Sequence, residues 1–215
     1  MAQARKLAYS QKRPFPEYFG KTMIQEKYQF PIKKEKELRK KIAKLKPVFK
    51  EKYFEKDLIL QPYGDKFVDR GVFIRLREHT SLDGGKKKRE LMLRTFEYQG
   101  KAEVREAVEF DLDKNREGAE NLMRFLQLLR TVIGTVLEKT SESYEVKIKR
   151  KKVFLRIDKL KRISNKIFLE MYTYCDKKDL QKFKEALSLC RKKLGFSSKE
   201  QITEPYFRLL MQKSS

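Results

Sequence analysis

Hydrophobic and polar residues alternate in many short segments of this chain, and a period of two is typical of β-strands with one buried face. In the segment GVFIRLRE, Ile74 and Leu76 share one face, whereas Arg75 and Arg77 share the other. Polar or glycine-containing turns separate several of these segments, so we expect a largely antiparallel series. The predicted strands cover residues 22–30, 54–61, 71–78, 90–98, 103–112, 142–149, 153–158 and 167–174.

Four other segments have the longer period of a helix. They cover residues 34–45, 115–133, 176–195 and 204–213. In the second, Leu122, Phe125, Leu126 and Leu129 form the predicted buried stripe, with Asp113 or Asn115 as its cap. Asp176 is the expected cap of the third, which ends at Gly195. Strands outnumber helices, and several strands carry charge on one face. The pattern predicts an α+β fold, an antiparallel β-barrel or tunnel with a polar interior and flanking helices.

Charge is the dominant feature of the composition. The 215 residues include 53 Lys and Arg against 30 Asp and Glu, a formal charge of +23, while 40% of residues are hydrophobic. The hydrophobic content suffices for one well-buried domain. The excess positive charge indicates a polyanionic partner such as nucleic acid, polyphosphate, a nucleotide or an acidic membrane. No apolar run is long enough to span a membrane. A single histidine, His79, argues against a zinc site or a Ser-His-Asp triad.

The first twenty residues are basic and contain prolines that prevent a regular helix. The cations Arg5, Lys6, Lys12 and Arg13 suggest either a disordered tail or a nucleic-acid-binding arm. We therefore divide the chain into a basic arm, residues 1–20, and one domain, residues 21–215. The two cysteines lack metal-ligand spacing and suggest reduced thiols in an intracellular protein. The cytoplasm is the favoured compartment, and a mitochondrial presequence is the alternative.

Cations also alternate on the predicted strands. Arg75 and Arg77 point the same way, roughly 6–7 Å apart, a spacing at which two guanidinium groups can hold successive phosphates. Arg94 and Arg105 repeat the pattern on the next two strands, and Lys139 precedes the later hairpin. The alternative is that these cations are solvated outer faces of a basic protein.

The order of these segments resembles the CYTH family, also called triphosphate tunnel metalloenzymes. EKDLILQPYGDKFVDRGVFIRLRE resembles the family's strand, turn and R-x-R strand, and RELMLRTFE is similar to its L-T-x-K strand with Arg94 in place of Lys. REAVEF is similar to R-x-E-x-E, KVFLRIDKLKRISNKIFLEMY to the paired strands before F-x-E-x-E, and EPYFRLL to the closing helix. The resemblance implies an antiparallel tunnel that binds a triphosphate.

The sequence departs from the family where the resemblance implies metal ligands. The opening E-x-E-x-K strand is QEKYQF, which places Gln25, Lys27 and Gln29 at those positions. Glutamine is a poor metal ligand, and a protonated lysine cannot be one. Ala107 and Tyr172 replace two further glutamates. A strand shifted by one residue would turn Glu26 inward, but it would also turn Tyr28 and Phe30 into the tunnel.

These residues define the predicted site. The phosphate-binding candidates are Lys27, Arg75, Arg77, Arg94, Arg105 and Lys139, and the remaining metal-ligand candidates are Glu109, Asp158 and Glu170. Two functions follow.

The favoured one is a catalytically degenerate CYTH-like protein that binds a phosphate-rich ligand, chiefly RNA or a ribonucleoprotein, without a cofactor. The alternative is a triphosphatase or class IV-type adenylyl cyclase that uses Mg²⁺ or Mn²⁺. The chain would act as a monomer or as a subunit of a larger complex, with RNA or a small phosphate-rich molecule as partner.

Overall fold

A computed structural model describes residues 22–63, 72–99, 102–114, 116–197 and 200–211. It contains one nine-stranded antiparallel sheet in the order β5-β4-β3-β2-β6-β7-β8-β1-β9. The strands are β1 (Thr22–Pro31), β2 (Val48–Pro62), β3 (Val72–Ser81), β4 (Lys87–Gln99), β5 (Ala102–Asp111), β6 (Thr131–Ile148), β7 (Lys151–Leu160), β8 (Lys166–Cys175) and β9 (Gln201–Ile202). The α-helices are α1 (Glu35–Ala43), α2 (Arg116–Leu128), α3 (Leu180–Leu194) and α4 (Tyr206–Met211).

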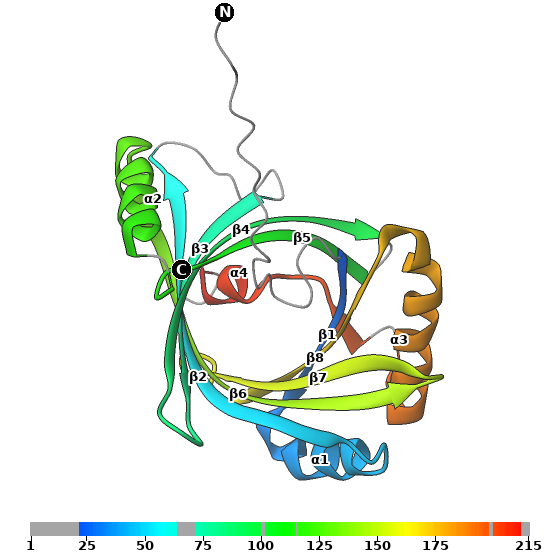
Figure 1. Cartoon of the computed structure of the whole chain (residues 1–215). Coiled ribbons are helices and arrows are strands. Elements are labelled where there is room, and N and C mark those ends of the chain that lie inside the picture. The colour runs from blue at the N-terminus through cyan, green and yellow to red at the C-terminus, as the bar shows by residue number, and fades with distance from the viewer. Residues whose placement is uncertain (1–21, 64–71, 100–101, 115, 198–199, 212–215) are drawn as a thin grey trace, which may run out of the picture.

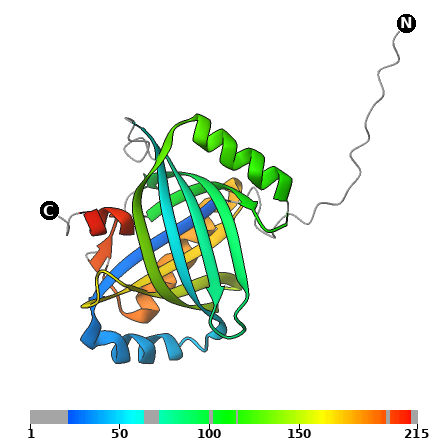
Figure 2. The same cartoon turned by 90° about the vertical axis from the view of Figure 1, so that its left-hand side faces the viewer.

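The sheet curls until its two sides meet, as Figures 1 and 2 show. β1 pairs with β5 over three residue pairs, from Met23 opposite Arg105 to Gln25 opposite Glu103. The same strand pairs with β8 along its whole length, from Thr22 opposite Cys175 to Pro31 opposite Lys166. The predicted antiparallel tunnel with flanking helices is therefore confirmed.

Helices cover the outside of this tunnel because the outward faces of the strands are apolar. Leu38 and Ile42 of α1, together with Leu187 and Cys190 of α3, are buried in the largest core cluster. A second cluster lies under α2, where Leu126 is buried. Helix α4 instead lies at one end of the tunnel (Figure 1). No helix within the described segments is long and apolar enough to cross a membrane.

One predicted helix was wrong in its last five residues. The segment 115–133 forms a helix only to Leu128, and residues from Thr131 belong to β6. Arg130 has a φ of 50°, a left-handed conformation that ends the helix. The following TVIGTV sequence is rich in β-branched residues, and it pairs with β2 as a strand.

The predicted burial and caps of the helices also need correction. Phe125 and Leu129 are 55% and 41% exposed, so only part of the predicted stripe of α2 faces the sheet. Of the two predicted caps of α2, Asp113 accepts hydrogen bonds from Arg89 instead, and Asn115 lies outside the described residues. A short 3₁₀ turn follows Asp176, so the third predicted helix begins later than expected, at Leu180.

Two other helix predictions are confirmed, the end of α3 at Gly195 and the presence of a last helix. Gly195 ends α3 with a φ of 70°, a conformation that glycine adopts without strain. The C-terminal helix is present as α4, although it is shorter than residues 204–213. The basic arm with Arg5, Lys6, Lys12 and Arg13 lies outside the described residues.

Candidate tunnel site

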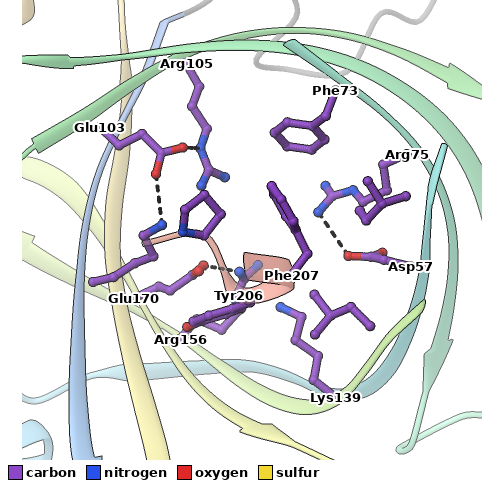
Figure 3. Close-up of a pocket in the computed structure, with 14 residues that line it drawn as sticks. Asp57, Phe73, Arg75, Glu103, Arg105, Lys139, Arg156, Glu170, Tyr206 and Phe207 are labelled. Atoms are coloured by element: carbon purple, nitrogen blue, oxygen red, sulfur yellow. Dashed lines mark hydrogen bonds and ion pairs between the residues drawn. The ribbon is translucent and has the colours of Figure 1, made fainter. Parts of the chain in front are cut away.

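The cations predicted to converge do lie on the inward face of the sheet. Lys27, Arg75, Arg105 and Lys139 line one internal cavity, although they come from four different strands (Figure 3). Arg77 and Arg94 are also buried, at 7% and 9% exposure. The alternative of cations solvated on outer faces is excluded for these six residues.

The register expected for the first strand is confirmed. Lys27 points into the cavity, whereas Glu26 and Tyr28 face the outer helix α3. The Tyr28 hydroxyl donates a hydrogen bond of 2.6 Å to Glu26, and Arg191 of α3 lies 3.5 Å from the same carboxylate. A shift by one residue would therefore bury Lys27 among apolar side chains and break both contacts.

Four charged interior residues were missed by the sequence reasoning. They are Glu55, Asp57, Glu103 and Arg156. The signal was present, because each alternates with an interior residue on its own strand, as in the pairs 103/105 and 156/158. Glutamate and arginine on a strand are common on solvated faces, so their type alone did not mark them as internal.

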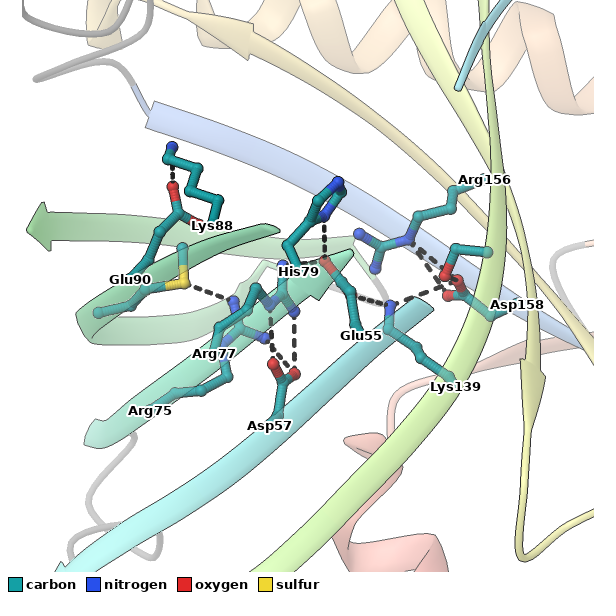
Figure 4. Close-up of polar contacts among 12 residues, drawn as sticks. Glu55, Asp57, Arg75, Arg77, His79, Lys88, Glu90, Lys139, Arg156 and Asp158 are labelled. Carbon is teal, nitrogen blue, oxygen red and sulfur yellow. Dashed lines mark hydrogen bonds and ion pairs between the residues drawn. The ribbon is translucent and has the colours of Figure 1, made fainter. Parts of the chain in front are cut away.

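The first group of interior charges joins β2 to β3 and β6 (Figure 4). Asp57 is fully buried and accepts hydrogen bonds from Arg75 at 3.0 Å and from Arg77 at 2.7 Å. Glu55 pairs with Arg77 on one side and with Lys139, at 2.9 Å, on the other. Burial disfavours the charged form of both carboxylates. For Glu55 the nearby cations have the larger effect, and they lower its pKa well below its usual range.

The second group is centred on Arg156 of β7. Its guanidinium donates hydrogen bonds to Asp158 and to Glu170 of the neighbouring strand. Asp158 also accepts bonds from Lys139, Ser141 and Tyr206, so its oxygens are fully engaged. Burial raises the pKa of Glu170, but Arg156, Lys139 and Arg105 outweigh it and hold the pKa at about 2.

A third group links β1 to β5. The Lys27 ammonium lies 3.0 Å from Glu103, which also accepts a hydrogen bond from Arg105. Burial disfavours the charge on Glu103, but Arg105 and Lys27 outweigh this and lower its pKa to about 2. The pKa of Lys27 is itself lowered, chiefly by burial. Three groups of opposite charges thus neutralise much of the interior.

Arg75 and Arg94 are the least compensated of these cations. The Nε atom of each is buried and has no hydrogen-bond partner among the described residues. Burial, with the nearby charges of Arg105 and Arg77, lowers the pKa of Arg94 to about 10, and burial also lowers that of Arg75. Both contact the sulfur of Met92, a weak acceptor. These two guanidiniums are where the interior is best able to accept an anion.

The three candidate metal ligands are not brought together. Glu109 lies beside Arg94, with an N–O distance of 3.4 Å, and remains 35% exposed. Asp158 and Glu170 share Arg156 on the other side of the tunnel. No group of three His, Cys, Asp or Glu residues that could hold a metal occurs in the described part of the chain. The residues present therefore do not fit a divalent cation unless several ion pairs break first.

The cavity that the interior cations line is small. Its volume is about 40 Å³, room for a few water molecules. Tyr206 and Phe207 of α4 project into it (Figure 3), and Phe207 packs 6.1 Å from the ring of Phe73. The C-terminal helix thus occupies one end of the tunnel with aromatic side chains.

Comparison with known proteins identifies the architecture. No protein-family model matches the sequence, and no curated protein matches it. The PH1819 protein from Pyrococcus horikoshii OT3 is similar in structure, with a TM-score of 0.72, 19% identity, and 89% of this chain and 99% of that one covered. HpAC1 from Hippeastrum, described as having a dominant triphosphatase activity, matches with a TM-score of 0.55 and 12% identity, covering 90% and 95%.

The chain has the CYTH-type tunnel fold. A chain in the Schizosaccharomyces pombe Mediator head module also matches, with a TM-score of 0.57, 11% identity and coverage of 81% and 94%. At such identities the likeness concerns the fold alone. The fold alone therefore does not decide between triphosphate hydrolysis and binding without catalysis. The charged side chains inside the tunnel bear on that choice.

Proposed function

We propose that this protein binds RNA through its exterior and does not hydrolyse triphosphates. One observation carries the proposal: within the described residues, the five buried interior carboxylates are each held by interior cations. They are Glu55, Asp57, Glu103, Asp158 and Glu170. A divalent metal would have to displace those cations and would be repelled by them, so the metal-assisted step of phosphoryl transfer has no support here.

The size of the cavity points to an exterior ligand. Pockets for small molecules typically measure roughly 300–1,000 Å³. The cavity that Lys27, Arg75, Arg105 and Lys139 line offers about 40 Å³, and Tyr206 and Phe207 form part of its wall. The excess positive charge of +23 is therefore available mainly on the surface, where it attracts a polyanion such as RNA.

Two assays test the proposal. We expect no phosphate release from ATP or from 5′-triphosphate RNA with Mg²⁺ or Mn²⁺. We also expect RNA affinity to fall steeply between about 50 and 200 mM salt, as phosphate contacts require. Turnover that is abolished by Glu170→Ala, or an RNA affinity that salt does not change, would refute it.

A second candidate, a triphosphate-binding enzyme, draws on one specific observation. The unpaired Nε atoms of Arg75 and Arg94 could each donate to a phosphate oxygen. This function would require α4 to leave the tunnel before a ligand could enter. Removal of residues 204–215 should then increase triphosphate binding, which isothermal titration calorimetry would measure, whereas the RNA-binding proposal expects no increase.

A further inference from the structure

We infer that helix α1 and the neighbouring Phe49 form the surface that binds single-stranded RNA, an inference that rests on the function proposed above. The surface consists of Phe49, near the start of β2, and a lysine stripe. The stripe comprises Lys33 in the 3₁₀ turn before α1, Lys36 and Lys40 of α1, and Lys44 at its C-terminal cap. The four lysines are exposed. They recur every three or four residues, so they lie along one side of the helix.

The lysine stripe is not neutralised by the protein. None of its four members forms an ion pair within the described residues. The acidic residues of α1 are occupied elsewhere, since Glu37 pairs with Lys41, and Glu35 pairs with Arg39 and Lys159. Four positive charges over a helix length of about 16 Å therefore remain free for external phosphates.

The stripe borders a shallow groove. Its lining residues are Ile32, Lys33, Glu35, Lys36, Arg39, Lys40 and Ala43. Arg39 fixes the inner side of the groove, because its guanidinium donates to Glu142 at 2.6 Å and reaches the Tyr144 hydroxyl at 3.4 Å. An ion pair between α1 and β6 thus holds the inner side of the groove.

Phe49 adds a stacking surface beside these charges. It follows α1 in the chain, is 51% exposed, and packs edge-on against Tyr144 with ring centroids 5.6 Å apart. Tyr144 is the residue that Arg39 contacts, so the aromatic pair adjoins the groove. An exposed aromatic ring beside a row of cations is the arrangement with which proteins bind single-stranded nucleic acid, since bases stack while phosphates follow the charges.

An anionic membrane is the competing partner for a basic helix, and the structure disfavours it. A membrane-surface helix buries its apolar face in the lipid. In α1 that face is already used, because Leu38 and Ile42 are each 3% exposed and pack against the sheet. Figures 1 and 2 show α1 lying against the outside of the tunnel.

The test compares two variants of equal charge. K33Q/K36Q/K40Q removes three cations from the stripe, and K178Q/K192Q/K193Q removes three exposed lysines near and on α3, for which no ion pair is found among the described residues. Fluorescence anisotropy with a labelled, mixed-sequence single-stranded RNA measures affinity against salt. Circular dichroism verifies that both variants fold.

We expect the stripe variant to lower the salt slope by about 2 and the affinity about a hundredfold near 0.1 M salt, since each single-strand contact contributes about 0.7 to the slope. The control variant should change affinity only a few-fold. F49L should weaken binding about tenfold with an unchanged salt slope, because it removes stacking rather than charge.

The outcomes separate the two proposals. If wild-type protein does not bind RNA at about 50 mM salt, the proposed function itself fails. If it binds and the stripe and control variants lose affinity equally, the assignment to α1 is wrong while RNA binding stands. The protein could instead bind vesicles of phosphatidylserine and phosphatidylcholine more tightly than RNA and lose this binding in the stripe variant. That result would show that the partner of α1 is a membrane and not RNA.

Discussion

Replacing Arg156 by methionine tests the charge network of the tunnel most directly. Arg156 is the hydrogen-bond partner of Glu170, whose side chain is 5% exposed. Asp158 would keep Lys139, Ser141 and Tyr206 after the change, whereas Glu170 would lose its partner. Removing one member of a buried ion pair costs about 3–5 kcal/mol, so R156M should lower the free energy of unfolding by that amount at pH 7.

The stability of this variant should depend less on pH in the acid range than that of the wild type. In the wild type the pKa of Glu170 is about 2, below its unfolded value, so its ion pair adds stability above the unfolded pKa that disappears as pH falls toward 2. In R156M the largest of the charges that oppose burial is gone, so the pKa of Glu170 rises, although Lys139, Arg105 and Lys27 still act on it. R156M should therefore lose less stability than the wild type as the pH falls from about 4.5 to 2.

Denaturant unfolding followed by circular dichroism measures both effects, because the chain contains no tryptophan for fluorescence. The double variant R156M/E170M removes both charges and should lie within about 1 kcal/mol of the wild type. R124M, an exposed arginine of α2, is the control and should change stability by less than about 0.5 kcal/mol. A loss below about 1 kcal/mol in R156M, with a wild-type pH profile, would refute the network.

Three further predictions concern the same framework. Tyr206→Phe removes a hydrogen bond of 3.0 Å to the buried Asp158 and should cost about 1–3 kcal/mol in denaturant unfolding; no change would mean that α4 is not held there. Glu103 and Glu170, both with a pKa of about 2, should cause wild-type stability to fall as pH drops from about 4.5 to 2, which acid titration by circular dichroism measures; a flat profile would contradict their ion pairs. Leu187→Ala in the fully buried core should cost about 2–5 kcal/mol, and a loss under 1 kcal/mol would contradict the packing of α3.

The sequence predicted the tunnel well because the period of a strand directly reports which side chains share a face. The inward orientation of the Arg75, Arg77 and Lys27 side chains followed from that period. The same reasoning failed at Thr131, since an apolar run at the end of a helix can continue either as helix or as strand. The choice there depended on pairing with β2, a long-range contact that a local pattern does not contain.

The neutralisation of the interior was beyond sequence reasoning for a related reason. Tyr206 reaches Asp158 across 48 residues of sequence, and Glu55 meets Lys139 across an even longer separation. Side-chain partners of this kind depend on strand order and register, which the residue types do not specify. The predicted phosphate-binding role of the six cations stays a prediction, although the structure brings them together.

The closure of the sheet has a consequence for how the chain folds. β1 is made early, yet its full-length partner is β8, and it completes the tunnel only through β5. Contacts so distant in sequence slow folding, since closing the long intervening loop costs entropy before the contacts contribute stability. Until β8 has been synthesised, Ile24 and Tyr28 have no complete surface to pack against. During translation the nascent chain therefore exposes the apolar face of β1 until β8 is available, a stage at which an unfolded chain is prone to aggregate.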